Sequence, residues 1–269
     1  MCVIRDTIKG VSELHELNIL HQQLHLEHIL VTLDGRLRVK ICGFSKSTHV
    51  PGDEKLESLA PGTIEGQGLL LDLSQLGWFL FHCFTFGQHI SNRFLQESDL
   101  HFLDHSPEGR HLINSLINRT QAYRPMAHDV LSHPFFWSSH EKFIFLAVVC
   151  TLSKGITGPL PDLENRKGLI FPKQFWSTLL PYHFVIHLMN NPPHYEFQDV
   201  KDLVRLVRNS FYHCEPNVVR VVGGTEAVVY DYFAGRFPSL LIQVYDCVCG
   251  DQQWRNEDVL KTYFECKQL

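Results

Sequence analysis

The chain has 269 residues, 44% of them hydrophobic and 20% charged, which is the composition of a globular protein and not of a disordered or fibrous one. Its 24 Lys and Arg stand against 29 Asp and Glu, and the formal net charge of −5 excludes recognition of nucleic acid by bulk positive charge. The eight Cys show no disulfide framework and the N-terminus shows no signal peptide, so we expect reduced thiols and a cytoplasmic location.

The first half of the chain is predicted to be helical with one small hairpin. Residues 11–20 fit a helix that ends near Leu20 and runs into an extended turn. Apolar residues with a period of two follow on both sides of Asp34-Gly35, which is a strong hairpin signal. Residues 68–87 are the most apolar stretch, but polar residues such as Asp72 interrupt it, so we expect a buried core helix and no membrane span.

This order of helix, turn, hairpin and apolar helix resembles the C-terminal lobe of a protein kinase. Residues 20–30 resemble the catalytic-loop pattern HRDLxxxN, with Gln23 at the position of the catalytic Asp and His28 at that of the metal-binding Asn. Gly43 occupies the Asp position of the DFG pattern. Asp72 matches the Asp that opens the large buried helix of the lobe.

Phosphoryl transfer needs a carboxylate to accept the hydroxyl proton and an Asp with an Asn to hold Mg²⁺. Gln23 and Gly43 provide no carboxylate, and the imidazole of His28 is a poor Mg²⁺ ligand. The resemblance therefore implies a pseudokinase lobe without its N-lobe, in which we expect neither phosphotransfer nor ATP binding.

Four His residues in this region offer an alternative interpretation as a zinc site. We favour structural and surface roles for them, because the predicted helix ends before i,i+4 spacing can bring them onto one face. No metal and no other cofactor is expected. The four residues are His15, His21, His25 and His28.

The segment 195–216 has the strongest helical pattern of the second half. Asp199 is a good N-cap and Pro216 a good stop signal. Apolar residues recur at helical spacing between them, and these are Val200, Leu203, Val204, Val207 and Phe211.

The opposite face of this predicted helix is polar. Lys201, Arg205 and Arg208 form a basic stripe, and Asn209 and His213 are four residues apart and stack on one face. An Arg fork can bind phosphate oxygens, an amide can orient them, and an imidazole can move a proton near neutral pH. On this pattern alone, an ordinary solvated face is the better interpretation.

Three motifs together change that interpretation. They are HPFFW at residues 133–137, the Arg208-Asn209 pair followed by His213, and YFAGRFPSLL at residues 232–241. Their combination, with Trp176 as an early tryptophan, resembles the kinase-extension nuclease family, which includes RNase L and the kinase/endoribonuclease of the unfolded protein response. The resemblance implies a mainly α chain.

The resemblance to this family places a kinase-like C-lobe at residues 1–136, helical apart from the hairpin, and a helical ribonuclease domain at residues 137–269. It further implies metal-independent RNA cleavage in RNA processing or decay. The 2′-hydroxyl attacks the adjacent phosphorus and leaves a 2′,3′-cyclic phosphate and a 5′-hydroxyl. His213 would be the general acid and Tyr195 the base-side group. The other implied roles are phosphate contacts by Arg208 and Asn209 and RNA contacts by Lys201 and Arg205.

Some features of the sequence count against an active ribonuclease. A phenol with a pKa of about 10 is a poor base unless Arg208 or Lys201 lowers that pKa. Residues 138–269 hold 13 Lys and Arg against 14 Asp and Glu, so RNA affinity from charge would be modest. Family members act as dimers, which implies a homodimer or a heterodimer with a relative. The alternative function is accordingly a catalytically silent interaction module that only dimerises.

Overall fold

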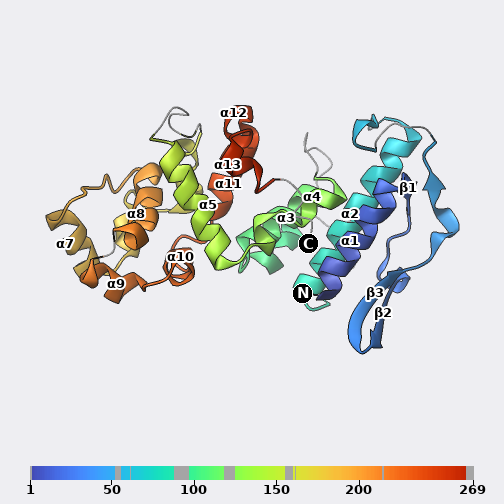
Figure 1. The fold of residues 1–269 in the computed structure, drawn as a ribbon, viewed down its shortest axis with the longest axis horizontal. Coiled ribbons are helices and arrows are strands. Elements are labelled where there is room, and N and C mark those ends of the chain that lie inside the picture. The colour runs from blue at the N-terminus through green and yellow to red at the C-terminus, as the bar shows by residue number, and fades with distance from the viewer. Residues whose placement is uncertain are drawn as a thin grey trace. The chain divides into compact units, whose positions relative to one another are not determined.

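The computed structural model describes residues 2–51, 56–60, 62–87, 97–117, 125–154, 160, 162–213 and 215–264. These residues form two compact units, one ending at Phe135 and the other beginning at Phe136. Both units are mainly helical, which confirms the predicted fold class (Figure 1).

The N-terminal unit combines helices with two small antiparallel sheets, β1–β4 and β2–β3. Its α-helices are α1 (Cys2–Glu16), α2 (Ile64–Phe84), α3 (Pro107–Ile117) and α4 (Ala127–Val130). Its strands are β1 (Ile19–Leu20), β2 (Ile29–Asp34), β3 (Arg36–Ile41) and β4 (Thr48–His49). Its 3-10 turns are η1 (Leu26–His28), η2 (Phe44–Lys46), η3 (Leu56–Ser58) and η4 (Glu97–Leu103), and η5 (Pro134–Phe136) lies at the junction of the units.

The hairpin predicted around Asp34-Gly35 is confirmed. Strands β2 and β3 pair antiparallel, with Ile29 opposite Ile41 along the ladder. Gly35 makes the turn with a φ of 69°, a left-handed backbone conformation that glycine adopts without a steric penalty.

Helix α1 ends at Glu16, earlier than the end predicted near Leu20. The chain leaves the helix because Asn18 adopts a φ of 55° and the next two residues pair as β1 with β4. Pairing with a distant strand therefore overrides the local helical pattern.

Helix α2 is the buried core helix that the apolar stretch predicts, and it packs against α3 beside α1 (Figure 1). Among the described residues, no helix has both the length and the apolar character needed to cross a membrane. The prediction that Asp72 opens this helix is wrong: α2 begins earlier, with Thr63 as its N-cap, and Asp72 lies inside it.

Asp72 is fully buried and satisfies the backbone of the segment that resembles a catalytic loop. Its carboxylate accepts the N–H groups of His21 and Gln22 at 2.7 and 2.6 Å and lies 3.2 Å from Nε2 of His15. A buried carboxylate is stable only with such partners. The polar interruption of α2 is thus a structural requirement of the neighbouring loop.

The C-terminal unit is built from helices among its described residues. These are α5 (Ser139–Leu152), α6 (Lys167–Ile170), α7 (Tyr182–Asn190), α8 (Val200–Tyr212), α9 (Pro216–Val222), α10 (Glu226–Ala234), α11 (Leu240–Gly250), α12 (Gln252–Arg255) and α13 (Asp258–Lys261). Two 3-10 turns, η6 (Glu164–Arg166) and η7 (Trp176–Leu179), connect them.

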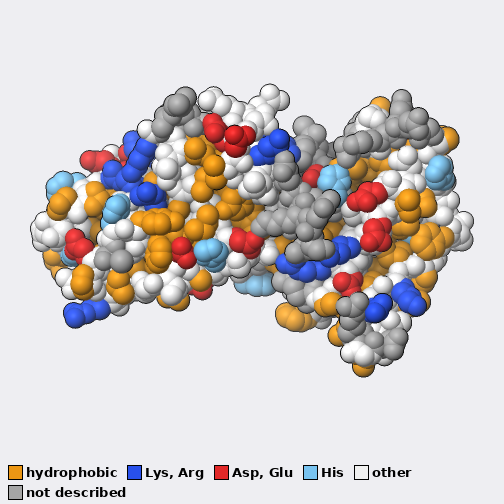
Figure 2. Space-filling model, viewed as in Figure 1, with side chains coloured by type: hydrophobic (Ala, Val, Ile, Leu, Met, Phe, Trp, Pro, Cys, Tyr) orange, Lys and Arg blue, Asp and Glu red, His pale blue; other side chains and the backbone are white. Residues whose placement is uncertain are grey.

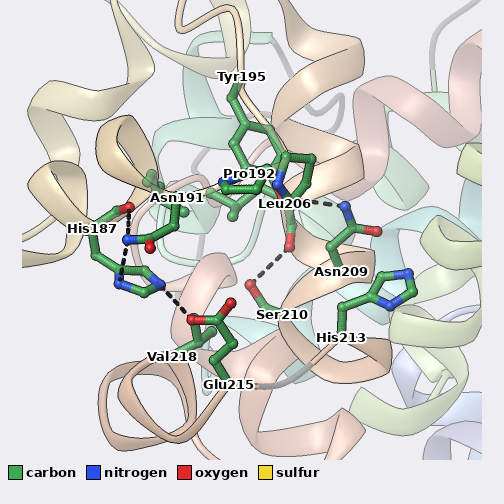
Figure 3. A pocket seen from close by; sticks show the side chains of 12 residues that line it. His187, Asn191, Pro192, Tyr195, Leu206, Asn209, Ser210, His213, Glu215 and Val218 are labelled. Carbon is green, nitrogen blue, oxygen red and sulfur yellow. Dashed lines mark hydrogen bonds and ion pairs between the residues drawn. The ribbon is translucent and has the colours of Figure 1, made fainter.

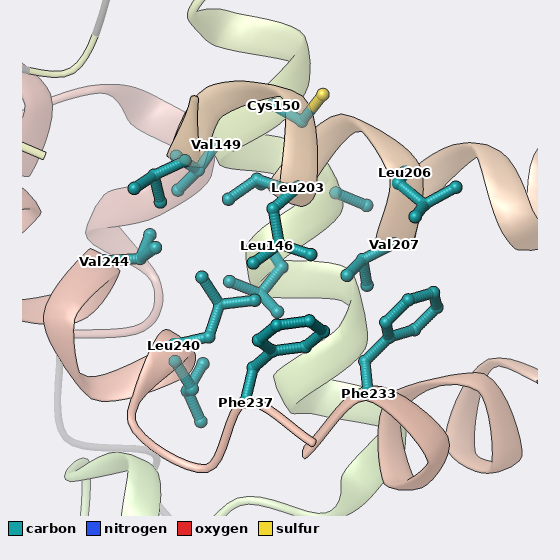
Figure 4. Close-up of a cluster of buried hydrophobic side chains, with 14 of the residues drawn as sticks. Leu146, Val149, Cys150, Leu203, Leu206, Val207, Phe233, Phe237, Leu240 and Val244 are labelled. Atoms are coloured by element: carbon teal, nitrogen blue, oxygen red, sulfur yellow. The ribbon is translucent and has the colours of Figure 1, made fainter. Parts of the chain in front are cut away.

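Helix α5 is central to the core of this unit, because it packs against both α8 and α10 (Figure 4). Its N-terminus carries a capping box in which Ser138 and Glu141 satisfy each other's backbone N–H groups. The motif at 232–241 supplies the corner between α10 and α11, where Phe237 and Leu240 are buried beside α5 and α8 (Figure 4). Each such side chain contributes roughly 1.5–3 kcal/mol on burial.

Candidate active site

Helix α8 is the platform of the candidate site. Its apolar face is buried against α5 and α10, and of the predicted residues Val200, Leu203, Val204 and Val207 are buried. Phe211 is only partly buried, and Leu206, which was not predicted, is buried as well. Asp199 is at the N-cap position, but its side chain makes no capping hydrogen bond. Instead the carboxylate of Glu164 accepts the N–H groups of Val200 and Lys201, both at 2.9 Å. The residue that caps α8 thus comes from η6, and local sequence gave no signal for it.

A chain of hydrogen bonds connects α5, α8 and the segment before α8. Arg208 donates from Nε to Oγ1 of Thr151 at 3.2 Å and from Nη1 to Oδ1 of Asn209 at 3.1 Å. Asn209 in turn donates from Nδ2 to Oη of Tyr195 at 3.2 Å. Because Asn209 is buried and bonded at both ends of its amide, its orientation is fixed.

His213 follows the last residue of α8 as its C-cap, and its N–H donates to the carbonyl of Asn209 at 2.9 Å. The side chain is exposed. His213, Asn209 and Tyr195 line one pocket (Figure 3). Arg208 does not line that pocket and reaches it through Asn209.

Tyr195 is positioned by a buried tryptophan. Trp176 is fully buried, its backbone N–H donates to the carbonyl of Phe197 at 2.9 Å, and its indole N–H donates to that of Asp199 at 3.1 Å. The rings of Trp176 and Tyr195 meet edge to face with centroids 6.5 Å apart. The segment between η7 and α8 is therefore anchored at both sides of Tyr195.

The electrostatics of Tyr195 favour its neutral form. Burial raises the pKa of the phenol above its usual value, and the hydrogen bond from Asn209 and the charge of Arg205 only partly oppose this. The guanidinium on the ring is that of Arg205, 4.7 Å from the centroid, and not that of Arg208 or Lys201. A protonated phenol that already accepts from Asn209 can donate its own proton into the pocket.

The predicted basic stripe is divided in the structure. Arg205 donates from Nη2 to Asp202 at 3.1 Å and to the carbonyl of His194, so it holds the segment before α8 in place. Lys201 has an exposed side chain whose Nζ lies 3.2 Å from Oδ2 of Asp199, and this carboxylate raises the pKa of the lysine. Only Lys201 and Arg208 thus keep cationic groups near the exposed side of α8.

Three pocket residues had no signal in the sequence pattern. His187 of α7 places Nε2 3.2 Å from Oε2 of Glu215, the N-cap residue of α9. Asn191 donates from Nδ2 to Nδ1 of the same imidazole at 3.2 Å and to the carbonyl of His187 at 2.9 Å. Figure 3 shows these residues on the side of the pocket away from Asn209 and His213. The helical period of α8 cannot reveal them, because they come from α7, from its C-cap and from the N-cap of α9.

Of the three positions that resemble a degenerate kinase site, His28 lies next to both of the others in the N-terminal unit. His28 donates from Nδ1 to the carbonyl of Gln23 at 2.6 Å. A Cβ built on Gly43 would lie 2.5 Å from the ring of His28, and Gly43 has a φ of 84°. The ring therefore occupies the space that any other residue at position 43 would need. The described residues contain no group of three metal-binding side chains.

Comparison with known proteins supports a family assignment. Residues 155–264 match the family model described as Ribonuclease 2-5A. The chain is 31% identical, over 97% of its length, to the "Serine/threonine-protein kinase/endoribonuclease IRE1" of Oryza sativa subsp. japonica, of which it covers 32%. It is 29% identical, over 98% of its length, to IRE1a of Arabidopsis thaliana, of which it covers 34%. It spans about a third of the length of these two relatives.

A further relative carries a different description. The "Inactive serine/threonine-protein kinase/endoribonuclease IRE1-like" of Arabidopsis thaliana is 23% identical over 97% of this chain and 55% of that protein. The family model and these relatives support a place for the chain in the kinase-extension nuclease family. Within it, the chain aligns with the kinase/endoribonucleases named IRE1.

Proposed function

We propose that this protein is a metal-independent endoribonuclease that cleaves RNA by attack of the 2′-hydroxyl on the adjacent phosphorus. The products are a 2′,3′-cyclic phosphate and a 5′-hydroxyl. The observation that carries the proposal is that Tyr195, Asn209 and His213 line one pocket.

Each of these side chains has a chemical role in the proposal. His213 protonates the leaving 5′-oxygen, because its imidazole is exposed at the pocket and imidazole can transfer a proton near neutral pH. Tyr195 donates a hydrogen bond to the phosphate, because its raised pKa keeps it protonated. The Asn209 amide contacts the phosphate of the RNA, and the hydrogen bond from Arg208 fixes the orientation of that amide.

RNA would be bound mainly by local contacts. Lys201 and Arg205 are both paired with a carboxylate, but the Lys201 side chain is 61% exposed and that of Arg205 only 25%, so Lys201 is the more accessible to RNA. On the face drawn in Figure 2, acidic side chains lie among the basic ones over the C-terminal unit. The proposal therefore expects modest, salt-sensitive affinity for RNA.

For the N-terminal unit, we propose a degenerate kinase-like lobe that neither transfers phosphate nor binds ATP. Gln23, His28 and Gly43 support this, because they provide none of the acids that the chemistry needs. We assign the C-terminal unit as the ribonuclease domain, working as a dimer in the cytoplasm.

A second candidate function is a silent module that only pairs with a relative. Two observations favour it: the raised pKa of Tyr195, which removes the expected base, and the relative whose name calls it inactive. The two candidates differ in one measurable property, which is cleavage of RNA by the pure protein.

The test is single-turnover cleavage of a fluorescent stem-loop RNA in EDTA, with dimerisation enforced. We expect His213→Ala to lower the rate by at least about 10²-fold, since a proton-transfer group contributes about 10²–10⁴-fold. The matched control is His183→Ala, an exposed histidine of α7 that does not line the pocket. Unchanged cleavage by folded His213→Ala, checked by circular dichroism, would make the silent module the better account.

A further inference from the structure

The proposed reaction needs a group that accepts the proton of the 2′-hydroxyl, and the residues of the family pattern do not provide one. The titratable side chains that line the pocket are His187, Tyr195, His213 and Glu215. Burial raises the pKa of Tyr195, which disfavours its phenolate form as the base, and His213 is assigned to the leaving oxygen. The other titratable side chains of the pocket are His187 and Glu215, which form one wall of it.

The imidazole of His187 is not available for this step. Asn191 donates to Nδ1, so the ring proton of a neutral imidazole is on Nε2, which then donates to the Glu215 carboxylate at 3.2 Å. Both ring nitrogens are thus engaged by protein groups. Only 17% of the His187 side chain is exposed, against 53% of Glu215.

Glu215 has the properties of a general base. Its carboxylate lines the pocket, one oxygen is held by His187, and more than half of the side chain is accessible to a substrate. Figure 3 shows Glu215 and His187 on one side of the pocket and Asn209 and His213 on the other. Displacement at phosphorus places the attacking and leaving oxygens in line, so a base and an acid on opposite sides fit the reaction.

We propose that Glu215 is the general base of the cleavage reaction, held in place by His187 and Asn191; this inference rests on the proposed nuclease function. Its carboxylate takes the proton of the 2′-hydroxyl while a lone pair of the 2′-oxygen forms the new bond to phosphorus. The bond from phosphorus to the 5′-oxygen breaks, and that oxygen keeps the electron pair and takes a proton from His213. Proton and electron count balance without a metal or another reactant.

The test separates the base from the acid with two substrates. One is the stem-loop RNA; the other is the same RNA with sulfur in place of the bridging 5′-oxygen at the linkage that wild-type protein cleaves. A thiolate leaves without being protonated, so this substrate needs the base and not the acid. With natural RNA, we expect Glu215→Gln and His213→Ala each to lower the single-turnover rate by at least about 10²-fold. With the sulfur-bridged RNA, only Glu215→Gln remains slow.

Two further variants make the result specific. Glu215→Asp keeps the carboxylate and should be faster than Glu215→Gln, whose folding is checked by circular dichroism. Glu226→Gln is the matched control, because Glu226 pairs with His140 at 3.1 Å in the same unit and does not line the pocket. It should cleave like wild type.

The outcomes that would overturn the inference are distinct from those that would overturn the nuclease function. If Glu215→Gln cleaves natural RNA like wild type, or recovers with the sulfur-bridged RNA, Glu215 is not the base and the nuclease function stands. If wild-type protein cleaves neither RNA, both proposals fail.

Discussion

The amide of Asn209 shows how a residue outside the pocket controls one inside it. An isolated amide side chain can present either its oxygen or its nitrogen to a ligand. In this protein the oxygen accepts from Arg208 and the nitrogen donates to Tyr195, so only one orientation satisfies both bonds. The adjacent Arg-Asn pair of the family pattern is thus explained by contact between the two side chains.

The direction of the Tyr195 pKa shift leads to a prediction at the residue scale. A phenol with a raised pKa releases its proton only at a higher pH, so a tyrosine base would make cleavage rise with pH to about 10 and beyond. We expect no such rise. Tyr195→Phe should slow single-turnover cleavage by about 10-fold, as for one lost hydrogen bond to a charged group, and should not change the shape of the pH profile.

The control for this prediction is Tyr182→Phe, which alters an exposed tyrosine of α7 away from the pocket. An alkaline rise that wild-type protein shows and Tyr195→Phe lacks would restore the role of Tyr195 as the base.

At the scale of elements, α8 shows what local sequence predicts well and what it does not. The apolar spacing predicts the helix, its buried face and both of its ends closely. The Glu164 cap and the His187–Glu215 contact were not predicted, because they join segments that are distant in sequence. The basic stripe predicted three cationic groups for RNA. Helical spacing could not show that Arg205 instead bonds to Asp202 and to the carbonyl of His194.

The cap of α8 gives a prediction for stability. Glu164→Ala removes the acceptor of two backbone N–H groups and should lower the free energy of unfolding by about 0.5–2 kcal/mol, the usual effect of losing an N-cap. Asp199→Ala should cost less, because the Asp199 side chain makes no capping bond. Urea denaturation of the full chain measures both. An equal or larger loss in Asp199→Ala would show that Glu164 is not the cap.

For the whole molecule, the sequence predicted a mainly helical chain and the position of the hairpin, since both depend on local periodicity and turn chemistry. The sequence could not show which groups form hydrogen bonds to the buried polar side chains. The partners of Asp72 come from a segment about 50 residues earlier, so its role inside α2 emerges only from the folded chain.

Assembly provides the prediction at this scale. If the ribonuclease domain acts as a dimer, the cleavage rate per molecule should rise with protein concentration, because association follows mass action. Initial rates over a dilution series, with sedimentation velocity on the same samples, measure this. A strict monomer with full turnover would contradict the dimer.

The close approach of His28 to Gly43 also limits which side chains position 43 can accept. A Cβ at position 43 would meet the imidazole at 2.5 Å, so an acidic side chain introduced at this position would clash with His28. His28→Ala combined with Gly43→Asp would relieve that clash, whereas Gly43→Asp alone would not. The backbone at Gly43, with its φ of 84°, adds a second barrier. The two positions are therefore sterically coupled, and a side chain at position 43 requires the ring at position 28 to move or to be replaced.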